Sequence, residues 1–272
     1  MHPQPTMIKD GRSARAYFRN GAPPFTQTTG MAPGYLQGSP VIVTSDVALE
    51  FLALCQRNMK PCPVIAISEV GASALPTLGD DIDVRTDLGG YRIWRNGKLA
   101  DEVTDIRSIW RNDFVTFVIG CSYSFDSALL SGGLQLRHVD ERKVAPMYRT
   151  NIPLIPAGRF HGTAYVSMRP FNAKDAIRAI EITSRFPMAH GTPLHIGDPS
   201  LIGVDLSNPL DCEPVSIRAD DIPVFWGCGI TPQHALLNAE LDLAISHKPG
   251  CMLITDVLSS GDAMVVPQLA AI

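Results

Sequence analysis

Apolar and polar positions succeed one another along the chain in segments that predict strands and helices in turn. Residues 40–44 (PVIVT) predict a strand, and Ser45 or Asp46 is expected to cap a helix through ALEFLALCQRN, where apolar residues recur at helical spacing. The unbroken apolar run at residues 114–120 (FVTFVIG) predicts a strand buried on both faces. It leads into CSYSFDSALLSGG, which predicts a helix that ends at a glycine pair.

The second half of the chain repeats this succession. Strands are predicted near residues 163–167 and within PLHIGDP, PVFWG and CMLITDV, and a helix within NAKDAIRAIEITSRF. In GITPQHALLNAEL we expect Thr231 to be the N-cap and Pro232 the first helical residue. The alternation of buried strands with helices favours an α/β fold with a mostly parallel sheet covered on both faces.

A less regular middle segment predicts a second, smaller unit. YRIWRNGK combines alternating side chains with an Asn-Gly turn, which is typical of a hairpin. We therefore expect a main domain made of residues 1–95 and 168–272, and a smaller α+β subdomain made of residues 96–167. The Gly- and Pro-rich residues 1–40 are expected to form an ordered arm on the main domain.

The composition of the chain argues against several classes of function. The 272 residues are 45% hydrophobic and 18% charged, with a net charge of −4, so no basic stripe is available for nucleic acid. No apolar run approaches the roughly 20 residues of a membrane helix, and the N-terminus lacks the apolar region of a signal peptide. The six cysteines include no CxxC pair, so we expect reduced thiols, no structural zinc and a cytoplasmic location.

Polar residues that follow predicted strands supply the candidate chemistry. If the strands are parallel, their carboxyl ends gather at one edge of the sheet, where α/β proteins bind ligands. Four such ends carry polar or glycine residues: Gly120-Cys121-Ser122, Gly197-Asp198, Gly227-Cys228-Gly229 with Thr231, and Thr255-Asp256. We therefore predict one shared pocket for a small carboxylate.

Cys121 and Cys228 are the first candidates for catalysis, since each follows a strand and precedes a helix. One thiol could remove a proton and the other donate one, or either could act as a nucleophile. Ser122 and Ser124 could contact a substrate carboxylate, as could backbone groups near Gly229. The alternative is that the cysteines are packed inside, the serines cap the helix and the glycines only shape the turn.

Histidine and arginine residues complete the candidate site. His195 is a candidate general base, which Asp198 would orient. Arg85 and Arg169 could each clamp a carboxylate, although ordinary ion pairs explain them equally well. His190, His195 and Asp198 do not share a helix face, so no metal ligand is assigned and no cofactor is expected.

Eight segments in order resemble the D-glutamate cyclase family, whose bacterial members are generally labelled hydro-lyases. The resemblance covers residues 12 to 257, nearly the whole chain. At Gly38-Ser39, within APGYLQGSPVIV, the resemblance leads us to expect Ala-Asn, and VIAISEVG also departs from the expected sequence. The matching segments are RNMKPCP, VRTDLGGYRIWRNG, FVIGCSYSFDSAL, PMYRTN, VSMRP, HGTPLHIGDP, PVFWGCGITPQ and HKPGCMLITD.

The resemblance implies an enzyme, a carbon–oxygen lyase that interconverts D-glutamate and 5-oxo-D-proline with loss or gain of water. It also implies a three-layer α/β/α domain with a smaller two-layer α/β domain. Two other classes stay open, a non-catalytic protein that binds a small carboxylate and a cysteine-dependent racemase or hydrolase. A small carboxylate is the expected partner, without nucleic acid or membrane, and homo-oligomer formation is left open.

Overall fold

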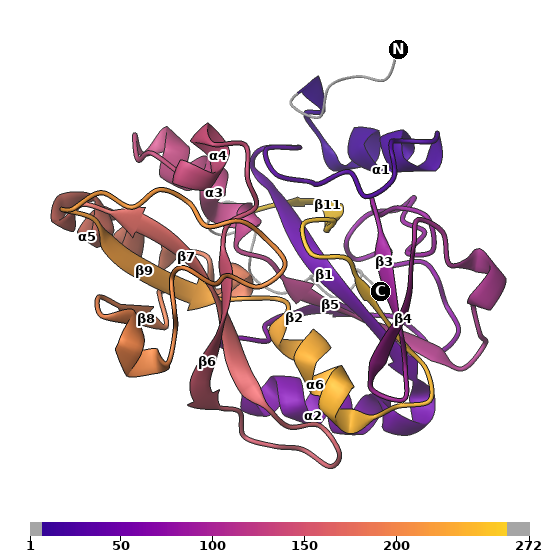
Figure 1. Cartoon of the computed structure of the whole chain (residues 1–272). Helices are drawn as coiled ribbons and strands as arrows, with labels where there is room; N and C mark the ends of the chain where they lie inside the picture. The colour runs from indigo at the N-terminus through magenta and orange to yellow at the C-terminus, as the bar shows by residue number, and fades with distance from the viewer. Residues whose placement is uncertain (1–6, 260–272) are drawn as a thin grey trace.

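The computed structural model of the chain describes residues 7–259, which form an α/β fold with two sheets (Figure 1). Within these residues the larger sheet has seven strands in the order β2-β5-β1-β10-β3-β4, with β11 also paired to β1. These strands are β1 (Tyr35–Thr44), β2 (Val64–Ile67), β3 (Tyr91–Arg95), β4 (Lys98–Val103), β5 (Phe114–Gly120), β10 (Ala244–His247) and β11 (Leu253–Leu258).

The smaller sheet has the order β6-β7-β9-β8, and helices pack against strands of both sheets. Its strands are β6 (Met147–Pro153), β7 (Thr163–Phe171), β8 (His195–Ile196) and β9 (Ile222–Gly227). The α-helices are α1 (Gly11–Arg19), α2 (Ser45–Arg57), α3 (Tyr123–Ser131), α4 (Arg137–Asp140), α5 (Ala173–Thr183) and α6 (Thr231–Ala239). Short 3₁₀ turns are η2 (Arg107–Ile109), η3 (Pro187–Ala189) and η4 (Pro199–Ile202).

The prediction of a mostly parallel sheet is wrong, because every strand pairing in the described residues is antiparallel. The β1–α2–β2 segment explains the error. β1 and β2 run in the same direction, as a crossover through a helix requires, but β5 lies between them and runs the opposite way. A later segment of the chain thus separates two strands that the local pattern suggests are neighbours.

The prediction for β5 is confirmed, since all seven residues from Phe114 to Gly120 are buried. On one face, Phe117 and Ile119 pack with Phe51 of α2. On the other face, Val118 packs in a core that also holds Phe125 of α3 and Trp226 of β9. The two sheets therefore share a hydrophobic core, and this core fixes the end of β5 relative to the end of β9.

Local turn signals are also confirmed in the hairpin. Asn96 and Gly97 join β3 to β4 with φ angles of 48° and 70°, the left-handed conformation that this short turn requires. The N-terminal arm packs on the protein through helix α1, which the sequence pattern did not predict. The predicted domain boundaries fall in this hairpin and inside β7, and the two-domain division stays a prediction.

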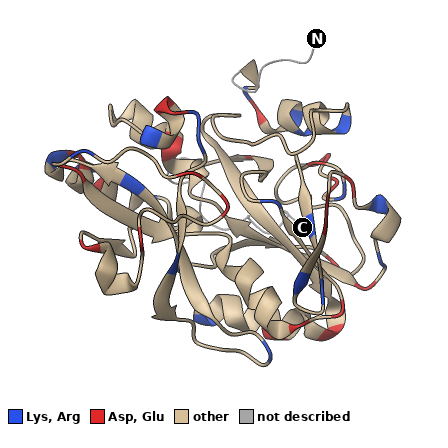
Figure 2. Cartoon of the chain, viewed as in Figure 1, with Lys and Arg blue, Asp and Glu red and all other residues tan. Residues whose placement is uncertain are grey.

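Acidic and basic residues are interspersed along the helices and loops (Figure 2). Within residues 7–259, no helix has the length and apolar character needed to cross a membrane.

Candidate active site

A small cavity lies where β5, β9 and β10 end and β11 begins. Its volume is about 30 Å³, and Ser39, Cys121, Ser122, Cys228 and His247 are among the residues that line it. Larger hollows, of about 540, 500 and 330 Å³, lie elsewhere among the described residues. We take the small cavity as the candidate active site because it brings together thiol, hydroxyl and imidazole groups from both sheets.

Two similar strand-to-helix turns form the centre of this site. The N–H groups of Cys121 and Cys228 donate to carbonyls of neighbouring strands, at 3.0 Å to Gln37 and 3.1 Å to Tyr165. The carbonyls of both cysteines accept hydrogen bonds from N–H groups in the first turn of the following helix, at 3.0 and 2.9 Å. Each cysteine is thereby held by its backbone on two sides.

The residue after each cysteine leaves a backbone donor free. Neither Ser122 N–H nor Gly229 N–H donates a hydrogen bond to another described residue, and both residues line the cavity. These free donors stand at the starts of α3 and α6, where the helix dipole also favours negative charge. The cavity therefore offers two positions suited to a carboxylate oxygen.

Both thiols in the cavity are proton donors at neutral pH. Burial raises the pKa of Cys121 to about 12, although a hydrogen bond from the Tyr123 backbone opposes the shift. Burial likewise raises the pKa of Cys228 to about 11, against a hydrogen bond from the Ile230 backbone. Cys228 contributes to the raised pKa of Cys121, which reflects the proximity of the two thiols.

A buried ion-pair network supports the serines of the cavity. The Arg169 guanidinium lies 2.8 Å from an Asp126 carboxylate oxygen, and His138 Nε2 lies 2.9 Å from the other oxygen. Burial alone would raise the pKa of Asp126, but Arg169 and His138 outweigh it and hold that pKa below its usual range. Arg169 also donates to Ser122 Oγ at 3.2 Å and to Ser167 Oγ at 3.3 Å.

The structure brings four of the predicted site residues to the cavity, namely Cys121, Ser122, Cys228 and Gly229. Three others lie behind it. Arg169 is 1% exposed and engaged by Asp126, so it orients serines and is not free to clamp a ligand. Ser124 Oγ accepts from Gln37 N–H at 2.9 Å, and Thr231 Oγ accepts from Tyr165 N–H at 3.0 Å. Each of these hydroxyls therefore links the start of a helix to a strand. The prediction that Thr231 is the N-cap of α6 is wrong, since Ile230 holds that position.

His195 and Asp198 do not line the cavity. β8 runs antiparallel to β9, and its His195 pairs with Phe225, so the chain moves away from the end of β9 as it approaches Asp198. His195 Nε2 lies 2.8 Å from the Asp198 backbone carbonyl, and the Asp198 side chain caps η4 through Ser200. The predicted pairing of imidazole with carboxylate is therefore absent from these described residues.

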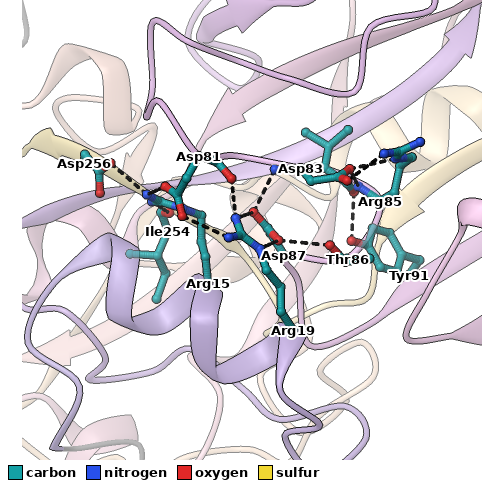
Figure 3. A network of polar contacts seen from close by, with 11 residues as sticks. Arg15, Arg19, Asp81, Asp83, Arg85, Thr86, Asp87, Tyr91, Ile254 and Asp256 are labelled. Carbon is teal, nitrogen blue, oxygen red and sulfur yellow. Dashed lines mark hydrogen bonds and ion pairs between the residues drawn. The ribbon is translucent and has the colours of Figure 1, made fainter.

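Asp256 and Arg85 also lie outside the cavity, in a network of charged residues near α1 (Figure 3). Asp256 accepts a hydrogen bond from Arg15 at 2.7 Å, and Arg85 pairs with Asp83 at 2.8 Å. Leu253 at the start of β11 and Gly120 at the end of β5 both pair with Gly38 of β1. β11 thus begins at the cavity and leaves it, which places Asp256 at the far end.

Sequence reasoning missed three polar residues of the cavity. Ser39 comes from the middle of β1, Ser167 from β7 and His247 from the end of β10. Burial lowers the pKa of His247 to about 3, so its ring is neutral, and Gln233 Nε2 lies 3.0 Å from its Nδ1. The polar end of the short strand AISH was an available signal for His247, whereas a lone serine within a strand gave none.

No cluster of three or more His, Cys, Asp or Glu side chains in the described part of the chain could hold a metal ion.

Comparisons with known proteins give a family and close relatives. The D-glutamate cyclase family model matches residues 115–256, which include both cysteine turns. A protein named "putative hydro-lyase" from Verminephrobacter eiseniae is 53% identical over 251 residues, 92% of this chain and 91% of the relative. A protein of the same description from Bradyrhizobium diazoefficiens is 49% identical over 255 residues, 93% of each chain. A nitrogen repressor-like protein from Methanococcus jannaschii aligns with a TM-score of 0.38 and 14% identity over 89% of this chain and 93% of its own, which does not establish a shared fold.

Proposed function

The chain belongs to the D-glutamate cyclase family, and from this premise we propose that it is a lyase that interconverts D-glutamate and 5-oxo-D-proline with loss or gain of water. The observation that carries the proposal is the meeting of two cysteine turns at one cavity, each with a free backbone donor beside a neutral thiol. D-glutamate has two carboxyl groups, and the turns offer one donor position for each. The cyclic product keeps one carboxylate and presents an amide carbonyl as the second acceptor.

The proton balance of cyclisation fits the raised pKa values of the thiols. The amine nitrogen bonds to the γ-carboxyl carbon, one C–O bond of that group breaks, and the two protons lost by the ammonium group leave with the oxygen as water. The first proton neutralises the γ-carboxylate. A thiol then gives a proton to the departing oxygen, and the thiolate formed takes the second proton from nitrogen. A thiol with a raised pKa stays protonated until this step and yields a strongly basic thiolate.

The hydroxyl groups of the cavity suit the substrate amine. Ser122 Oγ and Ser167 Oγ lie 3.3 Å apart and both accept from Arg169, which fixes their orientation. Ser39 lines the same cavity. These oxygens can accept hydrogen bonds from an amine without the cost of burying another charge.

The cavity must enlarge before it holds a substrate. Its volume of about 30 Å³ is far below the ~300–1,000 Å³ of typical small-molecule sites. Val144 and Ala145 line it from the loop before β6, Met147 lines it from the start of β6, and Pro249, Gly250 and Met252 line it from the loop between β10 and β11. Displacement of one of these loops is the route by which a substrate enters, and reclosure would exclude water from the reacting groups.

Chiral chromatography of purified protein incubated with D-glutamate, and separately with 5-oxo-D-proline, tests this proposal. We expect interconversion, with Cys121→Ser and Cys228→Ser each slower by roughly a hundredfold, the usual scale for loss of an acid or base. Cys55→Ser is the matched control, since Cys55 is a buried thiol in the hydrophobic cluster around α2 and does not line the cavity. Binding of D-glutamate without any turnover would replace the lyase by a carboxylate-binding protein.

A second candidate activity is exchange of the substrate Cα proton, which the presence of two thiols favours. The relay described above needs one thiol, whereas the cavity holds two, from two different sheets. If one is a thiolate, it can take the Cα proton while the other thiol returns a proton to the opposite face, which inverts the centre. Incubation of D-glutamate in D₂O with proton NMR decides between them: cyclisation with an undiminished Cα proton signal excludes exchange.

A further inference from the structure

His190 is a buried histidine for which the proposed reaction has no use. It is 2% exposed and follows η3, the turn that lies beneath the end of β5. Its Nδ1 lies 3.0 Å from the Lys60 carbonyl oxygen, and a carbonyl can only accept, so Nδ1 carries the proton. Burial lowers the pKa of the ring to about 4, and at neutral pH the ring is uncharged. Within residues 7–259, its Nε2 makes no hydrogen bond of ordinary geometry, although the Gly120 backbone lies near enough to the ring to raise its pKa slightly.

The backbone conformation of His190 is costly for a histidine. Its φ angle of 76° lies in the left-handed region, which glycine adopts without strain and a residue with a Cβ does not. Gly191, the next residue, has a φ of 66°, and a glycine adopts this conformation without strain because it has no Cβ. The presence of a buried imidazole at this left-handed position, with one nitrogen that makes no ordinary hydrogen bond, is explained if the ring itself has a structural or functional role.

The ring and its turn pack against both glycines that precede the cavity cysteines. A Cβ atom added to Gly227 would lie 3.0 Å from His190 Nδ1, and one added to Gly120 would collide with the Met188 carbonyl of η3. Gly120 N–H is bonded to the Pro63 carbonyl at 2.9 Å, within the segment that also supplies the Lys60 carbonyl. The imidazole therefore stands behind the two turns whose front faces carry the thiols.

The His190 ring also separates a neighbouring hollow from the two cysteine turns. His190 lines the hollow of about 500 Å³ that lies beside Lys60 and Thr192, and this hollow shares no lining residue with the cavity of the thiols. Without the ring, this hollow would extend to the backs of Gly120 and Gly227. Either turn could then retreat into the space and carry its cysteine away from the substrate.

We propose that His190 is a positioning residue, and that its buried ring, anchored on the Lys60 carbonyl, holds the Gly120–Cys121 and Gly227–Cys228 turns at the spacing the reaction needs. The catalytic part of this inference rests on the proposed function. The structural part does not, because the positions of the two thiols can be followed without any substrate.

Two substitutions at His190 separate the ring from the backbone. His190→Gly accepts the left-handed conformation but removes the ring. His190→Asn also tolerates this conformation, and its side-chain amide can donate to Lys60 as Nδ1 does, so it serves as the conservative control. We expect His190→Gly to lower kcat about tenfold or more, with KM changed much less, since a misplaced group affects the reacting geometry first. His190→Asn should recover most of kcat.

Thiol alkylation, resolved by mass spectrometry at each cysteine, provides the readout that needs no activity. In His190→Gly we expect faster labelling of Cys121 and Cys228 than in the wild type, with Cys251 unchanged, and a near wild-type pattern in His190→Asn. Unchanged labelling of both cavity thiols, or a parallel increase at all six cysteines that marks general unfolding, overturns the proposal. If His190→Gly does not fold, His190→Asn decides: a kcat as low as that of Cys121→Ser together with wild-type labelling of both cavity thiols would show that His190 does not act through the two turns and would overturn the proposal. Absence of any turnover in the wild type would refute the lyase and leave the labelling result to decide the role of His190.

Discussion

Asp126→Asn tests whether the ion-pair network behind the cavity is needed for stability as well as for orientation. The Asp126 carboxylate accepts hydrogen bonds from Arg169 Nε at 3.0 Å and lies 2.9 Å from His138 Nε2. The substitution keeps the shape of the side chain and removes its charge. Arg169, which is 1% exposed, then remains a buried cation without an anion.

The expected loss follows from this geometry. Removal of one partner from a buried ion pair costs about 3–5 kcal/mol, out of a total stability of roughly 5–15 kcal/mol. Arg169 also lies over the rings of Phe125 and Trp226, at 4.9 and 5.5 Å from their centroids, and such contacts retain part of the stabilisation of the cation. We therefore expect a loss of about 3 kcal/mol, near the lower end of that range.

Equilibrium unfolding in urea, followed by circular dichroism, measures this loss. Arg169→Met and the double variant complete the cycle, and we expect the double variant to lose less than the sum of the single losses because no buried charge is left alone in it. A loss below about 1 kcal/mol for Asp126→Asn, or strictly additive losses, would refute the reasoning.

The pH dependence gives an independent check. Because the pKa of Asp126 is lowered in the folded protein, its ionised form stabilises the fold above the unfolded pKa of about 3.9, and this contribution is lost as pH falls through the folded value. The stability difference between wild type and Asp126→Asn should thus be constant near neutral pH and shrink below about pH 4.

The remaining predictions concern the edge of the site. His195→Ala and Arg85→Ala should leave turnover within about twofold of wild type, since neither residue lines the cavity, and a hundredfold loss in the chromatographic assay would return either one to the site. Gly229→Ala should lower turnover about a hundredfold, because its methyl group would collide with Ser39 Oγ beside the free N–H. Ser39→Gly in the same chain removes the colliding atoms, so the double variant should be as active as Ser39→Gly alone, which itself loses one cavity hydroxyl; a double variant as slow as Gly229→Ala beside an active Ser39→Gly would show that the clash is not the cause.

The parts of the fold that local sequence determines were predictable. An apolar run of seven residues gave β5, helical spacing gave α2, and Asn96-Gly97 gave the hairpin. Strand direction was not predictable in the same way, because a buried strand has the same residue pattern whether its neighbours are parallel or antiparallel. Helix α1 was missed because its residues lie in a polar arm, where Asp10 caps the helix and Arg15 supplies a buried ion pair.

Part of the candidate site was predictable from the sequence because the ends of β5 and β9 lie close together. The apolar side chains that bring these two ends together are visible in the sequence. β5 and β9 both end at a glycine that a cysteine follows, and both contribute apolar side chains to one core, through Val118 and Trp226. The ends of β8 and β11 looked equally suitable in sequence, but register decides which end of a strand reaches the cavity. Leu253 and Gly120 both pair with Gly38, so the cavity meets the first residue of β11 and the last residue of β5. His247 reaches the cavity by the same logic, as β10 is antiparallel to β1 and ends beside Ser39. A polar residue at a strand end thus becomes a site residue only through the pairing of that strand, which depends on segments far away in the sequence.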